Sequence, residues 1–425
     1  MKKSLLLSVV ASTMIMAGGT IAPVEPVVVV VEDVPAVTGT FAEALKNGKF
    51  TANLRTFYFD RSFDEDKTGI RNSTALTFGG ILKYESAAYH GVKFGLAYYG
   101  SQRIGGFFSR EEGRGTSILG REGEDLGFLG EAYLQYDIGN TMFKVGRQQL
   151  ATPLIQNHDL RILPSVYEAA VIRNTDIPDT MIELGYVTAY TGFTSKDNQF
   201  LDYNKKWGED GLAYIYATNK SIENLTLRGQ YVKALTDTNA NGNPIFVDDY
   251  KYIDAKYAIP MGTNTYIKAQ YGGNAYNIGE DSTLLGVKAG TTFGMFDVAI
   301  LYDKISDNSF KAVESGPMYS DWQQGYGPYE PSTAFGGQLV VTPLSGLSIK
   351  LGYVDVQSDT QRLVDDFTEF NLDAKYAIND WSQIRVRYSI KDQSDESEAL
   401  RYDGIDGNGG RADRDDFRII YYMNF

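Results

Sequence analysis

The sequence of 425 residues contains no cysteine and only two histidines. The absence of cysteine excludes disulfide bonds, so an exported chain of this length must gain its stability from a large core or a closed sheet. The sequence offers few of the side chains that bind zinc, and no Gly-x-Ser-x-Gly motif accompanies His158. We therefore expect no enzyme activity, no metal site and no cofactor.

Long hydrophobic runs are also missing beyond the N-terminus. No later segment has the roughly 20 uninterrupted apolar residues that a membrane-spanning helix requires. The N-terminus itself has two lysines, an apolar run from Leu5 to Ala17, and then small residues that allow cleavage after Ala17 or Ala22. This pattern indicates a signal peptide, assigned to residues 1–22. The mature chain is therefore exported, and it either is soluble outside the cytoplasm or enters a membrane without helices.

Charge and composition narrow the class further. The formal net charge is −14, which argues against a nucleic-acid partner. The chain has 30 tyrosines and 44 glycines, a composition expected of membrane β-barrels with aromatic girdles and also of secreted β-rich proteins. Composition alone leaves both of these classes open.

Alternation of apolar and polar residues indicates strands from Lys49 onward. In the segment WSQIRVRYSIKD, the even-numbered positions from 384 to 390 are apolar and the odd-numbered positions from 385 to 391 are polar. A helix would scatter these charges over all its faces, whereas a strand places them on one face. The same pattern predicts 18 strands, at residues 49–59, 74–88, 92–103, 128–138, 142–149, 166–173, 180–193, 211–219, 223–235, 249–259, 264–274, 282–292, 295–306, 333–342, 346–356, 367–377, 381–391 and 415–425.

The connections between these strands alternate between nine long and eight short ones. Outer-membrane barrels have long external loops, short periplasmic turns and an even number of strands. The sequence therefore predicts an all-β fold, a transmembrane antiparallel β-barrel of 18 strands with long extracellular loops and short periplasmic turns. A soluble β-sandwich, propeller or β-helix is the alternative, and none of these folds would show such a strict alternation.

The barrel is expected to form one domain, residues 49–425, after an N-terminal periplasmic lead at residues 23–48. The proline, valine and acidic residues of the lead predict a mostly extended segment. Within it, Phe41 to Lys46 fit one helical turn.

The last strand ends on an aromatic residue, Phe425, although soluble domains usually end in a polar, frayed tail. We interpret this strand as the one that closes the barrel by pairing with residues 49–59. Every second side chain from Phe417 to Phe425 would then face lipid. Ile420 and Tyr422 would face the lumen, where such side chains do not suit water. We expect the N-terminal lead or an infolded loop to cover them, so that the barrel is partly filled.

Two long connections are too rich in apolar or aromatic residues to extend into water, and both are expected to fold into the lumen. The first, residues 150–165, has a mixed apolar and polar stretch between Pro153 and Pro164. The second, residues 307–332, combines aromatic residues with acids that could face a basic wall; an external loop packed on its neighbours is the alternative. The polar residues expected at the constriction are Asn157, His158, Asp159, Arg161, Asp307, Glu314 and Asp321.

A set of cations falls on the predicted lumen faces of the strands. Cations along a narrow pore lower the electrostatic cost of moving a carboxylate, and opposing carboxylates set the selectivity. The alternative is that these charges only solvate a water-filled wall and pair with acids. The candidate pore-lining residues are Arg55, Arg228, Lys350, Lys375, Arg385, Arg387 and Lys391.

The segment GRQQLATPLIQNHDLRILPSVYEAAVI resembles a motif of OprD-type outer-membrane specific porins, which runs from Gly-Arg-Gln through Thr-Pro-Leu to Arg-(Leu/Met)-Leu-Pro. The segment NLRTFYFDRSF is similar to the opening strand of that family. The resemblance implies an 18-stranded barrel that passes small solutes, often carboxylates or amino acids, with its third external loop folded inward and a basic track along the wall. The residues that match the motif are Arg147, Pro153, Arg161, Pro164 and Glu168.

These expectations together define a function. We expect an outer-membrane channel for passive, substrate-preferring diffusion of small water-soluble solutes through a loop-constricted pore. The alternative is a plugged structural or adhesive barrel whose external loops bind partners. Further expected partners are outer-membrane lipid, lipopolysaccharide and, through Phe425, the barrel-assembly machinery, and the chain is expected to be a monomer or a weak trimer. The acidic last connection, Asp392 to Asp416, lacks the spacing of an EF-hand, and the sequence does not identify the solute.

Overall fold

The computed structural model describes residues 39–63, 72–105, 116–120, 123–157, 161–192, 203–236, 238, 246–314, 316–320, 331–359, 366–393 and 413–425. The predicted signal peptide and the lead up to residue 38 lie outside these residues. Within the described ranges, no helix is long and apolar enough to cross a membrane.

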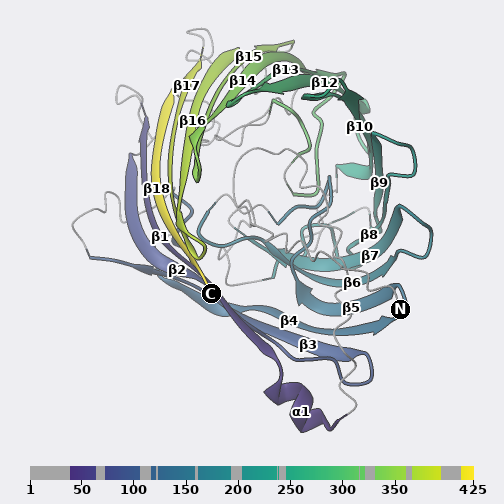
Figure 1. Ribbon diagram of the computed structural model, residues 1–425. Helices are drawn as coiled ribbons and strands as arrows, with labels where there is room; N and C mark the ends of the chain where they lie inside the picture. The colour runs from purple at the N-terminus through teal and green to yellow at the C-terminus, as the bar shows by residue number, and fades with distance from the viewer. Residues whose placement is uncertain are drawn as a thin grey trace, which may run out of the picture.

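Eighteen antiparallel strands form one sheet that closes on itself (Figure 1). Each strand pairs with its neighbours in the sequence, and the first strand also pairs with the last. The predicted fold class and strand number are confirmed, with small shifts at the strand ends. The strands are β1 (Lys49–Phe63), β2 (Ser73–Glu85), β3 (Val92–Arg103), β4 (Leu126–Ile138), β5 (Thr141–Gln148), β6 (Val166–Asn174), β7 (Thr180–Thr191), β8 (Leu212–Asn219), β9 (Leu225–Ala234), β10 (Val247–Pro260), β11 (Asn264–Tyr276), β12 (Ser282–Phe293), β13 (Phe296–Ser306), β14 (Ser332–Leu344), β15 (Leu347–Ser358), β16 (Phe367–Asn379), β17 (Ser382–Gln393) and β18 (Arg414–Asn424).

The strands place apolar side chains on the outside of the barrel and polar ones inside. On β11, Ile267 and Tyr271 are exposed on the outer surface, whereas Gln270 and Asn274 are buried in the interior. This arrangement follows from the period of two along a strand. An outward-facing apolar band is what a lipid bilayer requires of a barrel that crosses it.

The last strand closes the barrel against β1, as the sequence predicts. The backbone N–H of Phe425 donates to the carbonyl oxygen of Ala52 at 2.9 Å, and the N–H of Ala52 donates back to Phe425 at 3.0 Å. The ring of Phe425 stacks on that of Trp381, with 5.4 Å between the centroids. The chain therefore remains paired up to its final residue, and β1 has no open edge.

One short helix, α1 (Phe41–Lys46), precedes β1 at the end of the barrel that carries the short turns (Figure 1). The side chain of Thr40 accepts from the N–H of Glu43 at 3.3 Å, and the Glu43 carboxylate accepts from the N–H of Thr40 at 2.8 Å. This reciprocal capping box stabilises the first turn of the helix. The carbonyl of Ala44 accepts from Ala87 in the β2–β3 turn at 3.0 Å. The predicted helical turn is confirmed, and it is fastened to the periplasmic rim.

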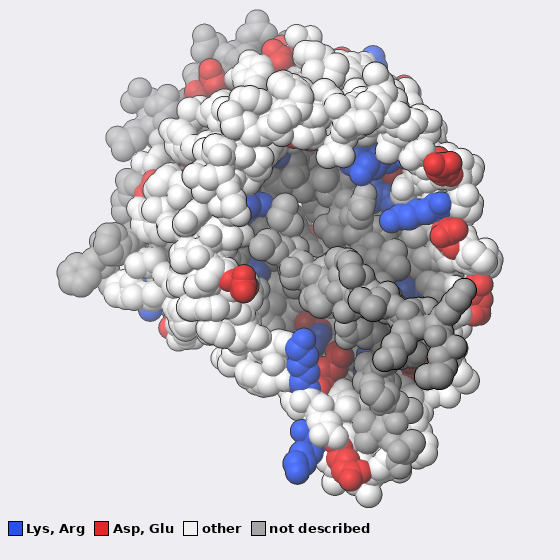
Figure 2. Space-filling view, viewed as in Figure 1, with Lys and Arg blue, Asp and Glu red and all other residues white. Residues whose placement is uncertain are grey.

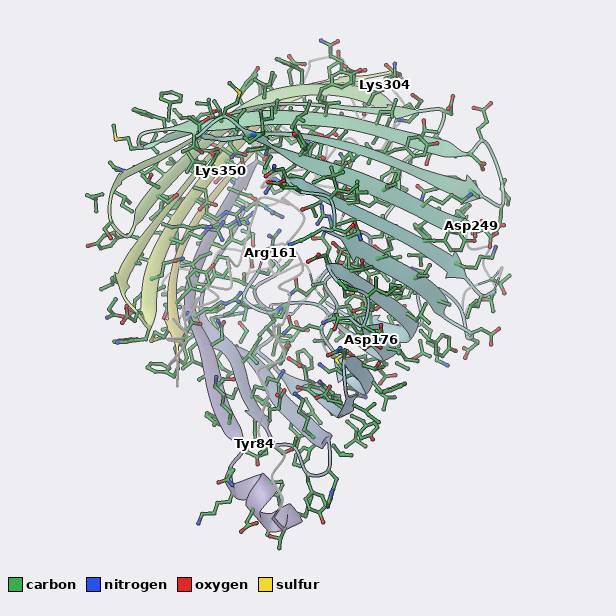
Figure 3. All side chains as sticks on the ribbon, turned by 45° about the vertical axis from the view of Figure 1, so that its right-hand side comes forward. Tyr84, Arg161, Asp176, Asp249, Lys304 and Lys350 are labelled. Carbon is green, nitrogen blue, oxygen red and sulfur yellow. The ribbon has the colours of Figure 1, made fainter. Side chains whose placement is uncertain are left out.

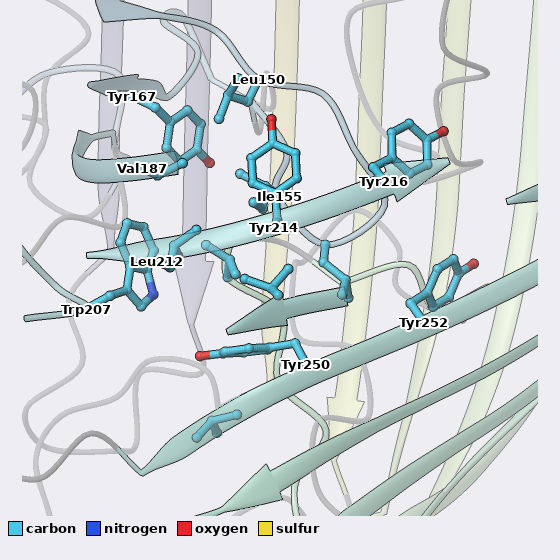
Figure 4. Packing of buried hydrophobic residues seen from close by; sticks show 14 of the residues in the cluster. Leu150, Ile155, Tyr167, Val187, Trp207, Leu212, Tyr214, Tyr216, Tyr250 and Tyr252 are labelled. Atoms are coloured by element: carbon cyan, nitrogen blue, oxygen red, sulfur yellow. The ribbon is translucent and has the colours of Figure 1, made fainter. Parts of the chain in front are cut away.

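Hydrophobic cores lie inside the barrel, between its wall and segments folded into the lumen. Ile420 and Tyr422 of β18 are buried in one core together with Ile162 and Leu163 of the β5–β6 connection. The predicted cover over these two residues is therefore confirmed, and it comes from an infolded loop. A second core joins the same connection to the wall formed by β6–β10, and Figure 4 shows its tyrosines around the loop.

Gly146 marks a close approach between β5 and β4. Its φ of 122° is one that L side chains rarely adopt, and a Cβ atom would lie 2.3 Å from the carbonyl oxygen of Ala132. We predict that Gly146→Ala destabilises the folded barrel by about 1–3 kcal/mol, measured as a lower urea midpoint of unfolding in micelles. At Gly229, the nearest atom to an added Cβ is 3.9 Å away, so Gly229→Ala is the control. Equal midpoints for the two variants would contradict the prediction.

Candidate functional site

The described parts of the connection between β5 and β6, residues 149–157 and 161–165, lie in the lumen and are called the first infolded loop. The buried side chain of Gln230 on β9 fixes one part of it. Its Oε1 accepts from the N–H of Leu154 at 2.8 Å, and its Nε2 donates to the Thr152 hydroxyl at 2.8 Å. Because buried backbone groups need hydrogen-bond partners, these two bonds hold the loop at a defined place on the wall. Leu154 and Ile155 are fully buried in the core shown in Figure 4.

The same loop reaches the opposite side of the barrel through Arg161. The carbonyl oxygen of Arg161 accepts from Nη1 of Arg55 on β1 at 2.8 Å. Ile162 and Leu163 follow and enter the core against β1 and β18. Figure 3 shows Arg161 within the ring of strands rather than at its edge. The first infolded loop therefore connects β9 to the seam where the barrel closes.

A second segment joins it in the lumen. Residues 307–314 and 316–320, which begin the β13–β14 connection, are called the second infolded loop. The N–H of Val313 donates to the carbonyl of Leu154 at 3.0 Å, and the N–H of Gln156 donates to the carbonyl of Glu314 at 3.2 Å. Ile155 and Glu314 form a parallel bridge. The two loops are thus paired through their backbones, and together they narrow the barrel.

The second infolded loop is fastened to the wall by polar side chains. The fully buried carboxylate of Asp303 on β13 accepts from Nε2 of Gln270 at 2.8 Å and from the N–H of Ser320 at 2.7 Å. On β11, Nδ2 of Asn274 donates to the carbonyl of Lys311 at 3.0 Å. Two hydrogen bonds to one buried carboxyl group, one of them from the loop backbone, make Asp303 a firm attachment point.

Asn157, one of the predicted constriction residues, has a role in holding the first infolded loop. Its Nδ2 donates to Oε1 of Gln149 at 2.9 Å. Gln149 in turn donates through Nε2 to the hydroxyl of Tyr99 at 2.7 Å and to Glu131 at 3.2 Å. This chain of bonds connects the loop to β3 and β4. Asn157 is therefore engaged within the protein.

A cluster of arginines lies where β16, β17 and β18 meet. Arg385 binds Asp373 through two nitrogen atoms, with Nε 2.7 Å from Oδ1. Arg387 stands directly opposite both Asp373 and Arg418 in the sheet. Its side chain is 1% exposed, and its Nε has no hydrogen-bond partner. A buried guanidinium group without a carboxylate of its own is a place where an anion would be stabilised.

Arg161 of the first infolded loop adds to this positive cluster. The guanidinium carbon of Arg161 lies 5.3 Å from the centroid of the Phe59 ring, and that of Arg418 lies 4.3 Å from the same centroid. Burial, and then the positive charge of Arg418, hold the pKa of Arg161 well below its usual range. Since arginine stays protonated in proteins, this lowering reflects chiefly the burial of Arg161 and, after it, the positive charge of Arg418 nearby. Figure 2 shows Lys and Arg side chains around the central hollow.

The other predicted pore-lining residues also lie on lumen faces. Arg228 forms a buried ion pair with Asp254, with 3.0 Å between Nε and Oδ1. Lys391 is buried near the extracellular end of β17. Lys350 and Lys375 are half-buried on β15 and β16, and Lys375 stands opposite Arg385. The wall from β15 to β18 therefore carries cations from four successive strands.

The predicted acids of the second infolded loop take different positions. Glu314 is buried and lies 4.0 Å from the ammonium group of Lys206. Asp307 is exposed at the end of β13. His158, Asp159 and Asp321 lie outside the described residues. In the described part of the chain, no group of His, Cys, Asp or Glu could hold a metal ion.

Several lumen cations were not found from the sequence. Their signal was present, because each occupies an alternate position in a strand whose other face is apolar. The sequence analysis did not identify them because the register between strands, which brings them together, cannot be derived from one strand alone. These residues include Lys256, Lys268 and Lys288.

Two of the motif-matched residues form an ion pair at the start of the first infolded loop. Nε of Arg147 lies 3.0 Å from Oε1 of Glu168, on neighbouring strands β5 and β6. The Arg147 guanidinium also lies 4.1 Å from the ring centroid of Tyr203, whose hydroxyl donates to the carbonyl of Gly130 at 2.8 Å. Arg147 and Glu168 therefore have a structural role, because together with Tyr203 they connect β4, β5 and β6 to the segment that leads into β8.

A closed membrane barrel, narrowed by infolded loops and lined by cations, defines an outer-membrane channel protein. The family model of OprD, described as an outer membrane porin family, matches residues 42–324. The chain belongs to the OprD family of outer-membrane porins, whose members are channels and not enzymes, and the bacterial outer membrane is its location.

Solved structures share the fold at low sequence identity. Pseudomonas aeruginosa OpdO has 16% identity and a TM-score of 0.69, with 90% of this chain and 98% of that chain covered. P. aeruginosa OpdK with vanillate has 15% identity and a TM-score of 0.71, with 90% and 99% covered. Acinetobacter baumannii OccAB1 has 15% identity and a TM-score of 0.71, with 90% and 97% covered. No curated protein sequence is significantly similar to this chain.

Gln230 should determine how firmly the first infolded loop is held. Gln230→Leu removes the acceptor of the Leu154 N–H and the donor to Thr152. Since an unpaired buried group costs about 1–3 kcal/mol, we expect amide exchange at residues 150–157 to accelerate on the order of tenfold or more. Mass spectrometry of deuterated peptides measures this rate. Gln357→Leu, at an exposed position of β15, is the control, and equal exchange in both variants would refute this role for Gln230.

Proposed function

We propose that this porin is a passive channel for small water-soluble anions, above all carboxylates and the carboxylate group of amino acids. The observation that supports this most directly is Arg387, a buried guanidinium beside a paired Asp373 and opposite Arg418. Asp373 is already bound by Arg385, so it neutralises Arg387 only in part. Because Arg387 is only 1% exposed, the positive field of this cluster, rather than direct contact with the guanidinium group, would attract a carboxylate that diffuses through the lumen.

The loops support the same proposal. A barrel of 18 strands is wide enough for an aqueous channel unless segments narrow it. The two infolded loops narrow it on the side of Arg161, so that a solute passes close to the arginine cluster. Cations at a narrow point of low dielectric lower the cost of moving an anion much more than cations in a wide pore. The solved relative OpdK was obtained with vanillate, a carboxylate.

The second candidate function is a plugged barrel with a structural or adhesive role. The observation that favours it is the amount of apolar filling, since both infolded loops pack into cores inside the lumen. The cation-lined wall favours the channel, because a plug needs no row of buried guanidinium groups. Outer-membrane lipid and lipopolysaccharide would surround either form, and a monomer or weak trimer fits both.

Planar-bilayer recording tests the proposal. In a KCl gradient we expect the folded protein to show open-channel current that favours anions. We expect Arg387→Gln to shift the reversal potential in the direction of lower anion selectivity. Flux of a small carboxylate into liposomes should fall by about threefold to tenfold in that variant. Lys304→Gln, which changes a lysine on the outer face of β13, should keep the parent values. Absence of any current from the folded protein would reject the channel, and an unchanged reversal potential would reject the role of Arg387.

We further propose that Phe425 serves recognition by the barrel-assembly machinery. Its side chain is 64% exposed at the periplasmic rim although its backbone is fully paired, so the ring is accessible to a partner. Phe425→Ser should lower the amount of folded protein in outer-membrane fractions by about fivefold or more, whereas Phe425→Trp should not, because assembly would recognise an exposed aromatic ring. Heat-modifiable mobility on gels measures the folded fraction. Equal folded yields for Ser and Trp would argue against recognition.

A further inference from the structure

The chain packs on the outside of the barrel wall just before the first strand begins. Tyr84 lies on the outer face of β2, because it stands directly opposite Phe50 on β1 and Leu96 on β3, which are both exposed on the outer surface. The hydroxyl of Tyr84 donates to the carbonyl oxygen of Leu45 near the end of α1. Figure 3 shows Tyr84 beside α1, at the margin of the molecule. α1 therefore lies against the outer side of the barrel at its periplasmic end.

Contacts with the β2–β3 turn fix the position of α1. Ala44 is 1% exposed, and its carbonyl oxygen accepts from the N–H of Ala87 at 3.0 Å. The ring of Phe41 meets the ring of Tyr89 edge to face, with 6.2 Å between the centroids. Together with the bond from Tyr84, these contacts hold both ends of the helix. α1 is therefore a fixed part of the barrel, although it has only six residues.

α1 and the start of β1 expose apolar side chains at this place. Phe41 and Leu45 lie one helical turn apart, so they share a face of α1, and they are 56% and 37% exposed. Phe50 on β1 is 62% exposed. Tyr84 lies between Leu45 and Phe50, since it binds the first and stands opposite the second. We call Phe41, Leu45 and Phe50 the rim patch. Apolar side chains gathered on a surface indicate an interaction site.

The rim patch continues the lipid-facing band of the barrel toward the periplasm. Leu82 precedes Tyr84 on the outer face of β2, and Tyr98 on β3 stands directly opposite Leu82. The side chains of Leu82 and Tyr98 are 39% and 50% exposed. The outward-facing apolar bands of membrane barrels end in aromatic girdles at the level of the lipid headgroups. This continuity places the rim patch at the headgroup level of the periplasmic leaflet, where the bilayer itself can cover it.

Two lysines flank the rim patch. Lys46 is in the last turn of α1, Lys49 is the first residue of β1, and both residues are exposed. The carboxylate of Glu43 is turned to the start of the helix, where it accepts from the N–H of Thr40. Figure 2 shows Lys and Arg side chains at the projecting end of the molecule, where Figure 1 places α1. The end of the helix that leads into β1 is therefore positively charged.

We propose that the rim patch docks into the periplasmic leaflet of the outer membrane and that Lys46 and Lys49 bind the phosphate groups of its anionic phospholipids. Apolar side chains at the boundary between headgroups and acyl chains, with cations beside them, are the combination that holds an interfacial helix on a bilayer. A free helix as short as α1 would not bind by itself, but the barrel already holds α1 at the membrane. The contact is independent of the proposed anion channel, because the rim patch lies outside the lumen.

A spin label tests where the rim patch lies. The chain has no cysteine, so Leu45→Cys takes a nitroxide label at one position of the full protein in vesicles of phosphatidylethanolamine and phosphatidylglycerol. Oxygen concentrates in lipid and a nickel complex stays in water. The ratio of label collisions with oxygen to those with nickel should be about threefold or more above the ratio at Glu223→Cys, an exposed position in the β8–β9 turn. Phe41→Cys gives a second reading of the same face of α1 and replaces Leu45→Cys if that variant does not fold.

Charge variants of the labelled protein test the phosphate contact. Lys46→Gln with Lys49→Gln should lower the collision ratio at position 45 by about twofold in vesicles that contain phosphatidylglycerol, and should leave it unchanged in vesicles of phosphatidylcholine alone. Lys46→Arg with Lys49→Arg keeps both charges and should retain the parent ratio. An equal effect of the Gln variant in both kinds of vesicle, or no effect in either, would overturn the role of anionic lipid.

Two further results would overturn the docking itself. A label at position 45 that is as accessible to nickel as the label at position 223 would show that the rim patch lies in water. A label that collides with neither reagent would show that protein covers the patch, either another segment of this chain or a second copy. Neither result depends on conduction, so the channel proposal would stand in both cases.

Discussion

The structure depends on one constraint, which is that every backbone N–H and C=O in a hydrocarbon layer must have a partner within the protein. A sheet satisfies this only when its first and last strands pair, and here β1 and β18 do so along their length, up to the final residue. Closure gives each strand one face toward lipid and one face toward the lumen. A barrel of 18 strands encloses more space than the side chains of its wall can fill. The infolded loops are the consequence, since the lumen of so wide a barrel must be filled or narrowed by segments from outside the wall.

The packing of the two infolded loops against the wall also explains why these loops are apolar where they lie in the lumen. Ile162 and Leu163 cover Ile420 and Tyr422, so the closing strand has a hydrophobic inner face at that height and a hydrophobic outer face toward lipid. Polar residues of the same loops point to hydrogen-bonding partners on the wall, with Gln230 and Asp303 as the main attachment points. The infolded loops thus combine apolar cores that resemble that of a soluble protein with polar attachments to the wall.

The strands were predictable because the alternation of apolar and polar residues is visible within each strand by itself. The sequence also predicted that Ile420 and Tyr422 would be covered, since two apolar residues on a lumen face contradict a wet interior. The alignment of Lys256, Lys268 and Lys288 was not predictable, because it exists only through the register between β10, β11 and β12, which the turn geometry sets. Similarly, Arg385 and Arg387 lie on the same face of β17. Only the fold shows that the Asp373 carboxylate forms its hydrogen bonds with Arg385, although Arg387 is the residue directly opposite it.

This division between neighbouring arginines matters for conduction. Breaking a buried pair such as Arg385 and Asp373 by removing one partner costs about 3–5 kcal/mol, so this pair is a fixed part of the wall. Its carboxylate also moderates the field of Arg387 and Arg418 next to it. A channel must bind a solute strongly enough to admit it and weakly enough to release it. Cations with no nearby acid would hold a carboxylate too long, and fully paired cations would not attract it. The structure lies between these limits, because one acid stands among several cations and the loops bring the solute past them.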